Sequence, residues 1–274
     1  MKASLLILLH IVYVQAVSAQ ESLADGKTHS ELANSGIAVS YVNQGIHWYN
    51  QRTSDAVGLK AKEEHINNAI PLFQKAIANP ESELEAGIYL MRSYIFKARF
   101  VEEGNSNKRK TFQLAKELGD RLVPKYPNSS ELRFEYISAI GQWGDAMDIF
   151  RAIKEGVVDM VKTQMEALIK LDPEFRNGIG ERSLAVLNLR VPHIPWILSW
   201  PDKKNALVML TKVFNKYPND LGNTFYYAEA LMKNNRKTEA KQYLLKALSI
   251  APKEDTMLED LSLHEQAREM LNKL

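Results

Sequence analysis

Cysteine is absent from this 274-residue chain. Its absence excludes disulfide bridges, thiolate zinc sites, cysteine nucleophiles and lipid attachment through a cysteine. A large excess of one charge is absent too, because 35 basic residues accompany 33 acidic ones and the formal net charge at pH 7 is +2. This balance gives no electrostatic reason to expect nucleic acid or an anionic membrane as a partner. Packing alone must therefore stabilise the fold.

Motifs for catalysis and metal binding are also missing. The sequence contains no glycine-rich phosphate loop, no Gly-x-Ser-x-Gly elbow and no aspartate-rich calcium loop. No two of the histidines after residue 20 are spaced to share a helical face as metal ligands. Nothing supplies a paired nucleophile and base. We therefore predict a protein that is not an enzyme and that uses no metal or cofactor.

The first twenty residues have the features of a secretory signal peptide. Lys2 precedes an apolar run at 5–17, and small residues follow before Gln20. The run is too short for a bilayer-spanning helix, which needs about 20 apolar residues. We expect cleavage after Ala19, so that 1–19 are removed, the mature protein reaches the periplasm and no membrane anchor remains.

Two landmarks recur in step along the rest of the chain. Five prolines each follow an amphipathic run, and a small or β-branched residue lies eleven or twelve positions before each of them. Two antiparallel helices approach closely only where a small residue lies at their crossing, and proline ends the second helix because it lacks an amide hydrogen. The pairs are Ala69 with Pro80, Ala115 with Pro127, Val161 with Pro173, Ala206 with Pro218 and Ala240 with Pro252.

The last unit has the most complete signature. The phrase at 227–231, the polar turn at 233–237 and the residues Ala240, Leu244, Ala247 and Pro252 resemble the tetratricopeptide repeat (TPR), whose length is about 34 residues. Earlier units are eleven to thirteen residues longer. The resemblance implies an all-α, right-handed superhelix of about five extended hairpins, in which Ala228 and Ala240 face each other.

The repeat predicts a single solenoid domain at 20–274. Its hairpins are expected near 32–80, 82–127, 129–173, 175–218 and 221–252, and a helix near 258–274 would cap the open end. The third hairpin would consist of helices near 129–149 and 152–171. Pro71 is expected in the first turn of its helix, where a missing donor costs little.

The chain also resembles one branch of exported repeat proteins. The run from 169–173 through 202–206 to 227–230 is similar to the T component of the tripartite ATP-independent periplasmic (TRAP) transporters. This resemblance implies a periplasmic protein that associates with a solute-binding subunit. A lipid-anchored member would need a cysteine after the signal, which this chain lacks.

The first helices of such repeats line the concave surface, and their outward side chains are free to contact a ligand. Aromatic residues interleaved with Arg and Glu are typical of recognition surfaces. The alternative is that the long helices curl tightly and bury the aromatics as core. The predicted contact residues are Arg92, Phe96, Phe134, Ser138, Gln142, Arg182, Phe225 and Glu229.

The segment 191–201 interrupts the fourth hairpin with three prolines and two tryptophans. It cannot be helical throughout. Such a stiff, apolar loop either covers the open end of its own hairpin or presents Trp196 and Trp200 to a partner.

These features favour an exported scaffold that binds a protein or peptide in its concave groove, and a solute-binding protein of a transporter is one candidate partner. The alternative is a carrier whose extended helices enclose a small apolar ligand. The residues do not distinguish an open groove from a closed cavity, and they do not specify the oligomeric state.

Overall fold

The structure is a computed structural model that describes residues 29–147 and 149–274. Within these residues it contains twelve helices and, apart from two isolated bridges, no β-structure. None of the helices in this part of the chain is long and apolar enough to cross a bilayer. The predicted signal peptide at 1–19 lies outside the described residues.

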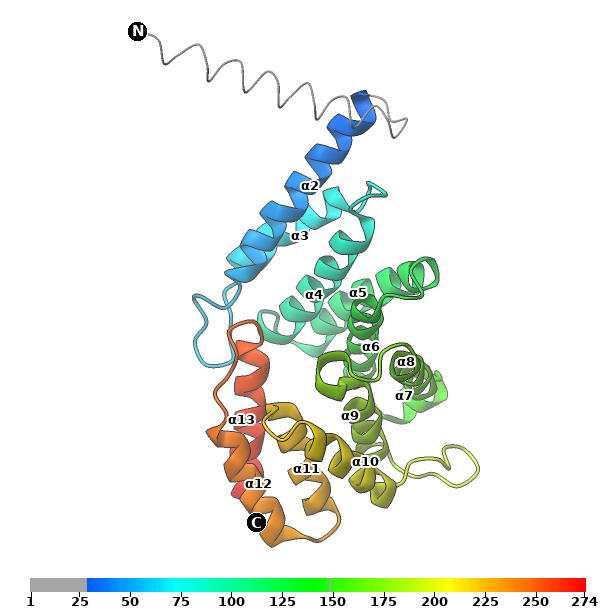
Figure 1. Cartoon of the computed structure of the whole chain (residues 1–274), viewed down its shortest axis with the longest axis vertical. Helices are drawn as coiled ribbons and strands as arrows, with labels where there is room; N and C mark the ends of the chain where they lie inside the picture. Colours follow the sequence, from blue (N-terminus) through cyan, green and yellow to red (C-terminus); the bar gives the residue numbers. More distant parts are fainter. Residues whose placement is uncertain (1–28, 148) are drawn as a thin grey trace.

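The helices pack in pairs, as predicted for an all-α repeat fold (Figure 1). The pairs are α2 (His29–Asn50) with α3 (Glu63–Ala76), α4 (Glu83–Phe100) with α5 (Asn105–Lys125), α6 (Ser130–Asp145) with α8 (Val157–Leu171), α9 (Phe175–Arg190) with α10 (Lys203–Lys216), and α11 (Leu221–Lys233) with α12 (Lys237–Ser249). The last helix, α13 (Met257–Leu271), packs on α11 and α12. The prediction for the third pair was wrong in one respect, because α6 ends at Asp145 and a short α7 (Ile149–Lys154) follows it.

The small residue of each repeat is buried, as close helix crossing requires. Ala69, Ala115, Ala206 and Ala240 have no exposed surface, and Val161 is nearly as covered. Ala228 is buried as well, but it packs in a cluster with Leu244, whereas Ala240 packs in a cluster with Leu231. The two alanines of the last hairpin therefore contribute to neighbouring clusters.

The repeat prolines lie just beyond the ends of helices, but Pro71 does not follow the prediction. Helix α3 begins at Glu63, so Pro71 lies in the helix interior and not in the first turn. Proline cannot donate the hydrogen bond that the carbonyl of Asn67 would otherwise receive. Burial of Ile66 and Phe73 on the same helix offsets this loss.

Glycine allows neighbouring helices to approach closely at two crossings. A Cβ atom added at Gly87 of α4 would overlap Cδ1 of Leu122 on α5. One added at Gly119 of α5 would overlap Cδ2 of Tyr136 on α6. Each added Cβ atom would lie well inside the van der Waals distance of its neighbour. Helix α5 can therefore pack closely against α4 and α6 only because glycine occupies these two positions.

We expect Gly119→Ala to lower the free energy of unfolding by about 1–3 kcal/mol, because the new methyl group overlaps the Tyr136 ring. Gly141→Ala on α6 is the matched control. No atom lies within 4 Å of the Cβ position there, so alanine should stabilise that helix by about 0.5–1 kcal/mol. Urea unfolding measures both changes, and equal losses in the two variants would contradict the packing argument.

The Lys-Tyr-Pro-Asn sequences that follow two of the hairpins make the same closing contacts. Lys125 forms an ion pair with Glu83, the first residue of α4, and Tyr126 Oη donates a hydrogen bond of 2.6 Å to the same carboxylate. The second set consists of Lys216 and Tyr217 with Glu174, which precedes α9. Each motif therefore ties the end of a second helix to the start of its first helix, where a negative charge is favourable.

These contacts make a prediction about acid stability. The hydrogen bond from Lys125, followed by that from Tyr126, holds the pKa of Glu83 below its ordinary value. A carboxylate with a lowered pKa contributes stability above its unfolded pKa of about 4.3 and loses it as the pH falls through the lower folded pKa. Glu83→Gln should therefore lower the thermal midpoint at neutral pH, and the difference should begin to shrink below about pH 4.3 and vanish once the pH falls below the lowered folded pKa.

Thermal unfolding followed by circular dichroism across this pH range tests the prediction. Glu85→Gln, an exposed position in the same turn of α4, is the control for a general effect of removing a carboxylate. If the difference in thermal midpoint between native protein and Glu83→Gln stayed constant from neutral to acidic pH, the ionised form of Glu83 would not be what stabilises the fold.

The start of α13 contacts the first two hairpins, although it lies far from them in the sequence. Leu258 at the start of α13 is buried in a cluster with Ile66, Phe96 and Phe100. Arg52, which follows α2, donates a hydrogen bond to the carbonyl of Asp255. Figure 1 shows the start of α13, in red, beside the blue segment that joins α2 to α3.

Candidate functional site

Four charged side chains from three first helices meet in what we name the Arg–Glu cluster: Arg92 of α4, Glu131 and Glu135 of α6, and Arg176 of α9. Arg92 Nε lies 2.8 Å from Glu135 Oε1, and Arg176 Nη2 lies 4.0 Å from the same oxygen. Glu131 pairs with both arginines. Glu135 and Arg92 are the more buried pair, and the side chain of Glu135 is only 7% exposed. Glu131 and Arg176 keep more accessible surface, and the side chain of Arg176 is 39% exposed.

Arg176 is presented by an unusual backbone. Arg176, Asn177 and Gly178 have φ values of 45°, 59° and 72°, so three consecutive residues are left-handed. This conformation costs roughly 1–2 kcal/mol for a residue other than glycine. Asn223 Nδ2 donates a 3.1 Å hydrogen bond to the carbonyl of Asn177, which helps to hold the turn. Strain of this kind is concentrated at functional sites in proteins.

Aromatic rings surround the Arg–Glu cluster. The guanidinium of Arg176 lies 4.9 Å from the ring centroid of Phe134, and Phe175 lies 5.9 Å from Phe134. Arg92 lies 5.2 Å from the ring of Tyr89. Phe134 is partly exposed. Arg92 and Phe134, two of the predicted contact residues, therefore both belong to a group of mixed aromatic and charged side chains.

Acidic residues near the start of α13 act electrostatically on this part of the molecule. Burial lowers the pKa of Arg176, and the charge of Asp255 acts in the opposite direction. Burial also raises the pKa of Tyr49 on α2, and Glu259 on α13 adds to that effect. Residues near the start of α13 therefore contribute to the electrostatics of Arg176 and of Tyr49.

A second group, which we name the Arg190 group, lies at the other ends of α6 and α9 and includes residues of α11. Arg190 of α9 makes hydrogen bonds of 2.8–3.2 Å with both oxygens of Glu229 on α11. Its guanidinium lies 5.3 Å from the ring of Tyr226. Burial raises the pKa of Asp145 at the end of α6, and the charge of Arg190 partly offsets this. The predicted residue Glu229 is therefore the buried anchor of this group.

One face of α6 connects the two groups. Residues spaced three and four apart share a face of a helix, and the positions between Glu135 and Asp145 on this face are Ser138 and Gln142. Both side chains are partly exposed. The two predicted polar contacts therefore lie on a strip that runs from the Arg–Glu cluster to the Arg190 group.

Arg182 was predicted to contact a ligand from a first helix. In the structure its guanidinium binds residues of this protein instead. Arg182 Nη1 lies 2.7 Å from Asp220 Oδ1 and 2.9 Å from Asn223 Oδ1. Asp220 also caps the start of α11. Burial alone would raise the pKa of Asp220, but Arg182 and the cap hold it below its ordinary value. Arg182 therefore fixes α9 against α11.

Phe96 and Phe225 require a correction, because the structure buries both as core. Each side chain is 1% exposed. Leu258 and Phe100 cover Phe96, and Phe225 packs with Leu244 and other residues of the last hairpin and α13. The alternative of buried aromatics, which the sequence left open, therefore holds for these two positions.

The loop between α9 and α10 is buried at its base and exposed at its tip. Leu198 is buried with Val158 of α8, and Trp200 Nε1 donates a 3.3 Å hydrogen bond to Asp159 of α8. The base of the loop thus packs on the preceding hairpin and also on Leu187 of α9, in its own hairpin. Trp196 at the tip is fully exposed.

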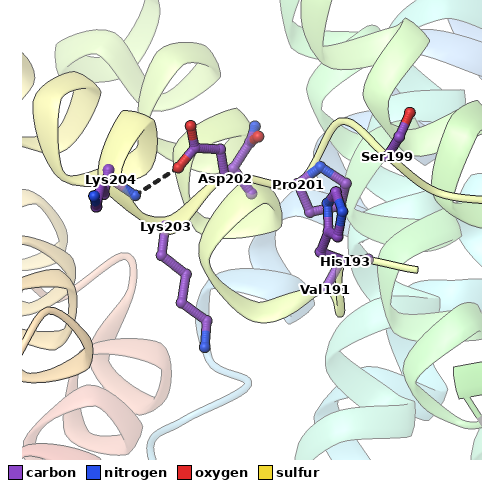
Figure 2. A pocket seen from close by; sticks show the side chains of 8 residues that line it. Val191, His193, Ser199, Pro201, Asp202, Lys203 and Lys204 are labelled. Carbon is purple, nitrogen blue, oxygen red and sulfur yellow. Dashed lines mark hydrogen bonds between the residues drawn. The ribbon is translucent and has the colours of Figure 1, made fainter. Parts of the chain in front are cut away.

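A pocket of about 420 Å³ lies at the base of this loop (Figure 2). Its lining residues are Asn188, Val191, His193, Ser199, Pro201, Asp202, Lys203 and Lys204. The dashed line in Figure 2 marks the 2.8 Å hydrogen bond from the amide of Lys204 to Asp202 Oδ1. Because Asp202 caps the start of α10 in this way, an anion does not have those amides available.

Five residues of the Arg–Glu cluster and the Arg190 group were not predicted from the sequence: Glu131, Glu135, Asp145, Arg176 and Arg190. The polar positions of 131–145 recur at helical spacing, which is the signal that could have revealed the face of α6. The partners on α9 have no such signal, since the left-handed turn at 176–178 sets the direction of Arg176. Within the described ranges, no three His, Asp or Glu side chains are placed to hold a metal ion.

Several solved structures of other proteins resemble this chain. A thermophilic TPR protein of Thermus thermophilus matches with a TM-score of 0.58 and 16% sequence identity, over 86% of this chain and 99% of that chain. MamA protein matches with a TM-score of 0.48 and 15% identity over 77% and 90% of the two chains. Tom70 of yeast matches with a TM-score of 0.36 and 14% identity over 95% and 59%.

No family model and no curated protein matches the sequence. The resemblance to the T component of TRAP transporters therefore depends on the sequence motifs alone. The pairwise packing of helices and the likeness to the Thermus protein establish the fold class. The chain has an all-α, TPR-like repeat fold.

Proposed function

We propose that this protein is an exported scaffold that binds a protein or peptide partner along the inner strip between the Arg–Glu cluster and the Arg190 group. TPR folds typically serve protein–protein interaction. The observation that carries the proposal is the solvent-accessible row of Ser138, Gln142 and Asp145 on one face of α6, which runs between two groups of paired charges.

The chemistry of the strip suits a polypeptide. Positively charged arginines and negatively charged carboxylates lie at both ends of the strip, and the partly exposed Ser138 and Gln142 lie between them. A peptide backbone presents donors and acceptors that hydroxyl and amide side chains can pair with. Arginine near a partly desolvated surface binds carboxylates strongly. An extended peptide with charged side chains therefore fits better than a purely apolar ligand.

Site-specific crosslinking in cells tests the proposal. A photoreactive amino acid at Gln142 should form an adduct with one defined protein, and the same residue at Lys241, exposed on α12, should not. Arg190→Ala should reduce the Gln142 adduct several-fold, whereas Arg236→Ala, which breaks an exposed pair with Glu239, should leave it unchanged. Equal adducts at both positions, or none at Gln142, would refute the inner strip as the binding surface.

The proposed compartment has its own test. The apolar run at 5–17 and the small residues before Gln20 support export. Mass spectrometry of the protein from a periplasmic fraction should give a chain that begins at Gln20. Recovery of the intact chain from the cytoplasm alone would contradict export. The solute-binding subunit that the TRAP resemblance implies is one specific candidate for the crosslinked partner.

A further inference from the structure

A stiff turn displays two apolar side chains at the tip of the loop between α9 and α10. The Ile197 amide donates a 3.2 Å hydrogen bond to the carbonyl of Ile194, and the Ile194 amide donates one of 2.9 Å to the carbonyl of Leu198. Pro195 fixes the first central position of the turn. We name Trp196 and Ile197 the knob, and their exposed fractions are 101% and 69%.

The conformation of the knob is unfavourable for the isolated chain. Trp196 has a φ of 70°, and the equivalent turn position usually holds glycine because other residues are strained there. A fully exposed tryptophan also leaves a large apolar surface in water. Strain and apolar exposure together at one residue indicate a contact that forms only when another molecule is bound.

The pocket at the base of the same loop has a complementary surface. Val191 and Pro201 are buried and form its apolar part, while His193, Ser199 and Lys203 are exposed around it. Figure 2 shows His193 and Pro201 on one side of the pocket and Lys203 on the other. An aromatic ring inserted there gains apolar contact, a hydrogen-bond partner for its indole N–H, and a cation near its face.

We propose that the knob of one copy of this chain inserts into the pocket of a second copy, and that the second copy does the same in return. Knob and pocket lie within one segment, 191–204, so a two-fold arrangement of two loops fills both pockets at once. Insertion of one knob into an unrelated partner, or into a lipid surface, would leave the pocket without a role.

The contact area sets the expected strength of the dimer. Each buried aromatic side chain contributes about 150–250 Å², so two knobs and the walls that receive them bury roughly 600–1,000 Å². Stable interfaces bury about 1,200–2,000 Å². We therefore expect a weak dimer, populated in the micromolar range below about 500 µM, in which Trp196 is the dominant contact of each half.

Sedimentation velocity of the purified protein from about 1 to 500 µM tests the proposal. The native chain should shift from monomer to dimer with concentration. Trp196→Gly should weaken the dimer at least tenfold without loss of fold, because glycine tolerates the positive φ. Ser199→Trp, which fills the pocket from within its own chain, should weaken the dimer to a similar extent. Val208→Ala, at an exposed position of α10, should change nothing.

Mixing the two variants tests reciprocity. Trp196→Gly retains a pocket, and Ser199→Trp retains a knob, so an equimolar mixture should form a heterodimer through one contact although neither variant associates alone. A native chain that stays monomeric up to about 500 µM, or a dimer that Trp196→Gly leaves intact, overturns the proposal. A monomer that co-sediments with anionic phospholipid vesicles through Trp196 also overturns it and assigns the knob to a membrane surface.

Discussion

Phe225→Ala is expected to lower the free energy of unfolding by about 3–5 kcal/mol. The side chain is fully buried and packs against Leu244 and Ala267, so its removal leaves a cavity between α11, α12 and α13. Urea unfolding followed by circular dichroism measures the loss. The reason for choosing this residue is that its position in the repeat predicts a ligand contact, whereas its burial predicts a core residue.

A second position on the same hairpin provides the control. Leu245→Ala removes a comparable apolar side chain from α12, but this leucine is exposed, so the change should stay within about 0.5 kcal/mol. If Phe225→Ala kept its native stability and lost only the Gln142 adduct, the side chain would have to reach the partner and the core assignment would be wrong.

Arg92→Met should cost about 3–5 kcal/mol, because Glu135 would lose its 2.8 Å partner while remaining almost fully covered. Arg176, at 4.0 Å from Glu135, does not replace the lost hydrogen bond. The double variant Arg92→Met with Glu135→Leu should recover most of this loss, since no buried charge is then left unpaired. Unfolding of the native chain, both single variants and the double variant gives the coupling energy directly.

An exposed ion pair is the control for this cycle. Arg236 and Glu239 lie 2.6 Å apart, and both side chains are 45% exposed, so Arg236→Met should cost no more than about 1 kcal/mol. A coupling between Arg92 and Glu135 as small as that of the exposed pair would mean that the Arg–Glu cluster does not stabilise the fold. It would then be free to exchange its internal partners for those of a bound peptide.

The positions of the helices could be predicted because their determinants are local. Alanine at a crossing and proline after a helix act within a few residues of where they occur, and both landmarks survive in every repeat. The errors have equally local causes. Pro71 resembles a helix start but lies inside α3, and residues between Asp145 and Val157 form an additional short helix that the repeat spacing does not include.

The side chains of the inner face were harder to predict because distant contacts decide their exposure. Phe96 lies four residues after Arg92 and shares its helix face, yet Leu258 of α13 covers it. Nothing in the sequence around Phe96 indicates that cover. The backbone turn at Arg176 is a further example, because three successive left-handed residues are not expected from Arg-Asn-Gly alone.

The contact of Leu258 with Phe96 and Phe100 also has a consequence for the order in which the chain folds. Ribosomes deliver the amino-terminal part of a chain first, and domains begin to fold as they emerge. Phe96 and Phe100 are therefore made long before Leu258, which follows Phe100 by 158 residues. Until α13 is available, the second hairpin presents an uncovered apolar end that invites aggregation. A chain truncated before Leu258 would keep this apolar surface exposed permanently. Chaperones and proteases should therefore recognise the truncated product.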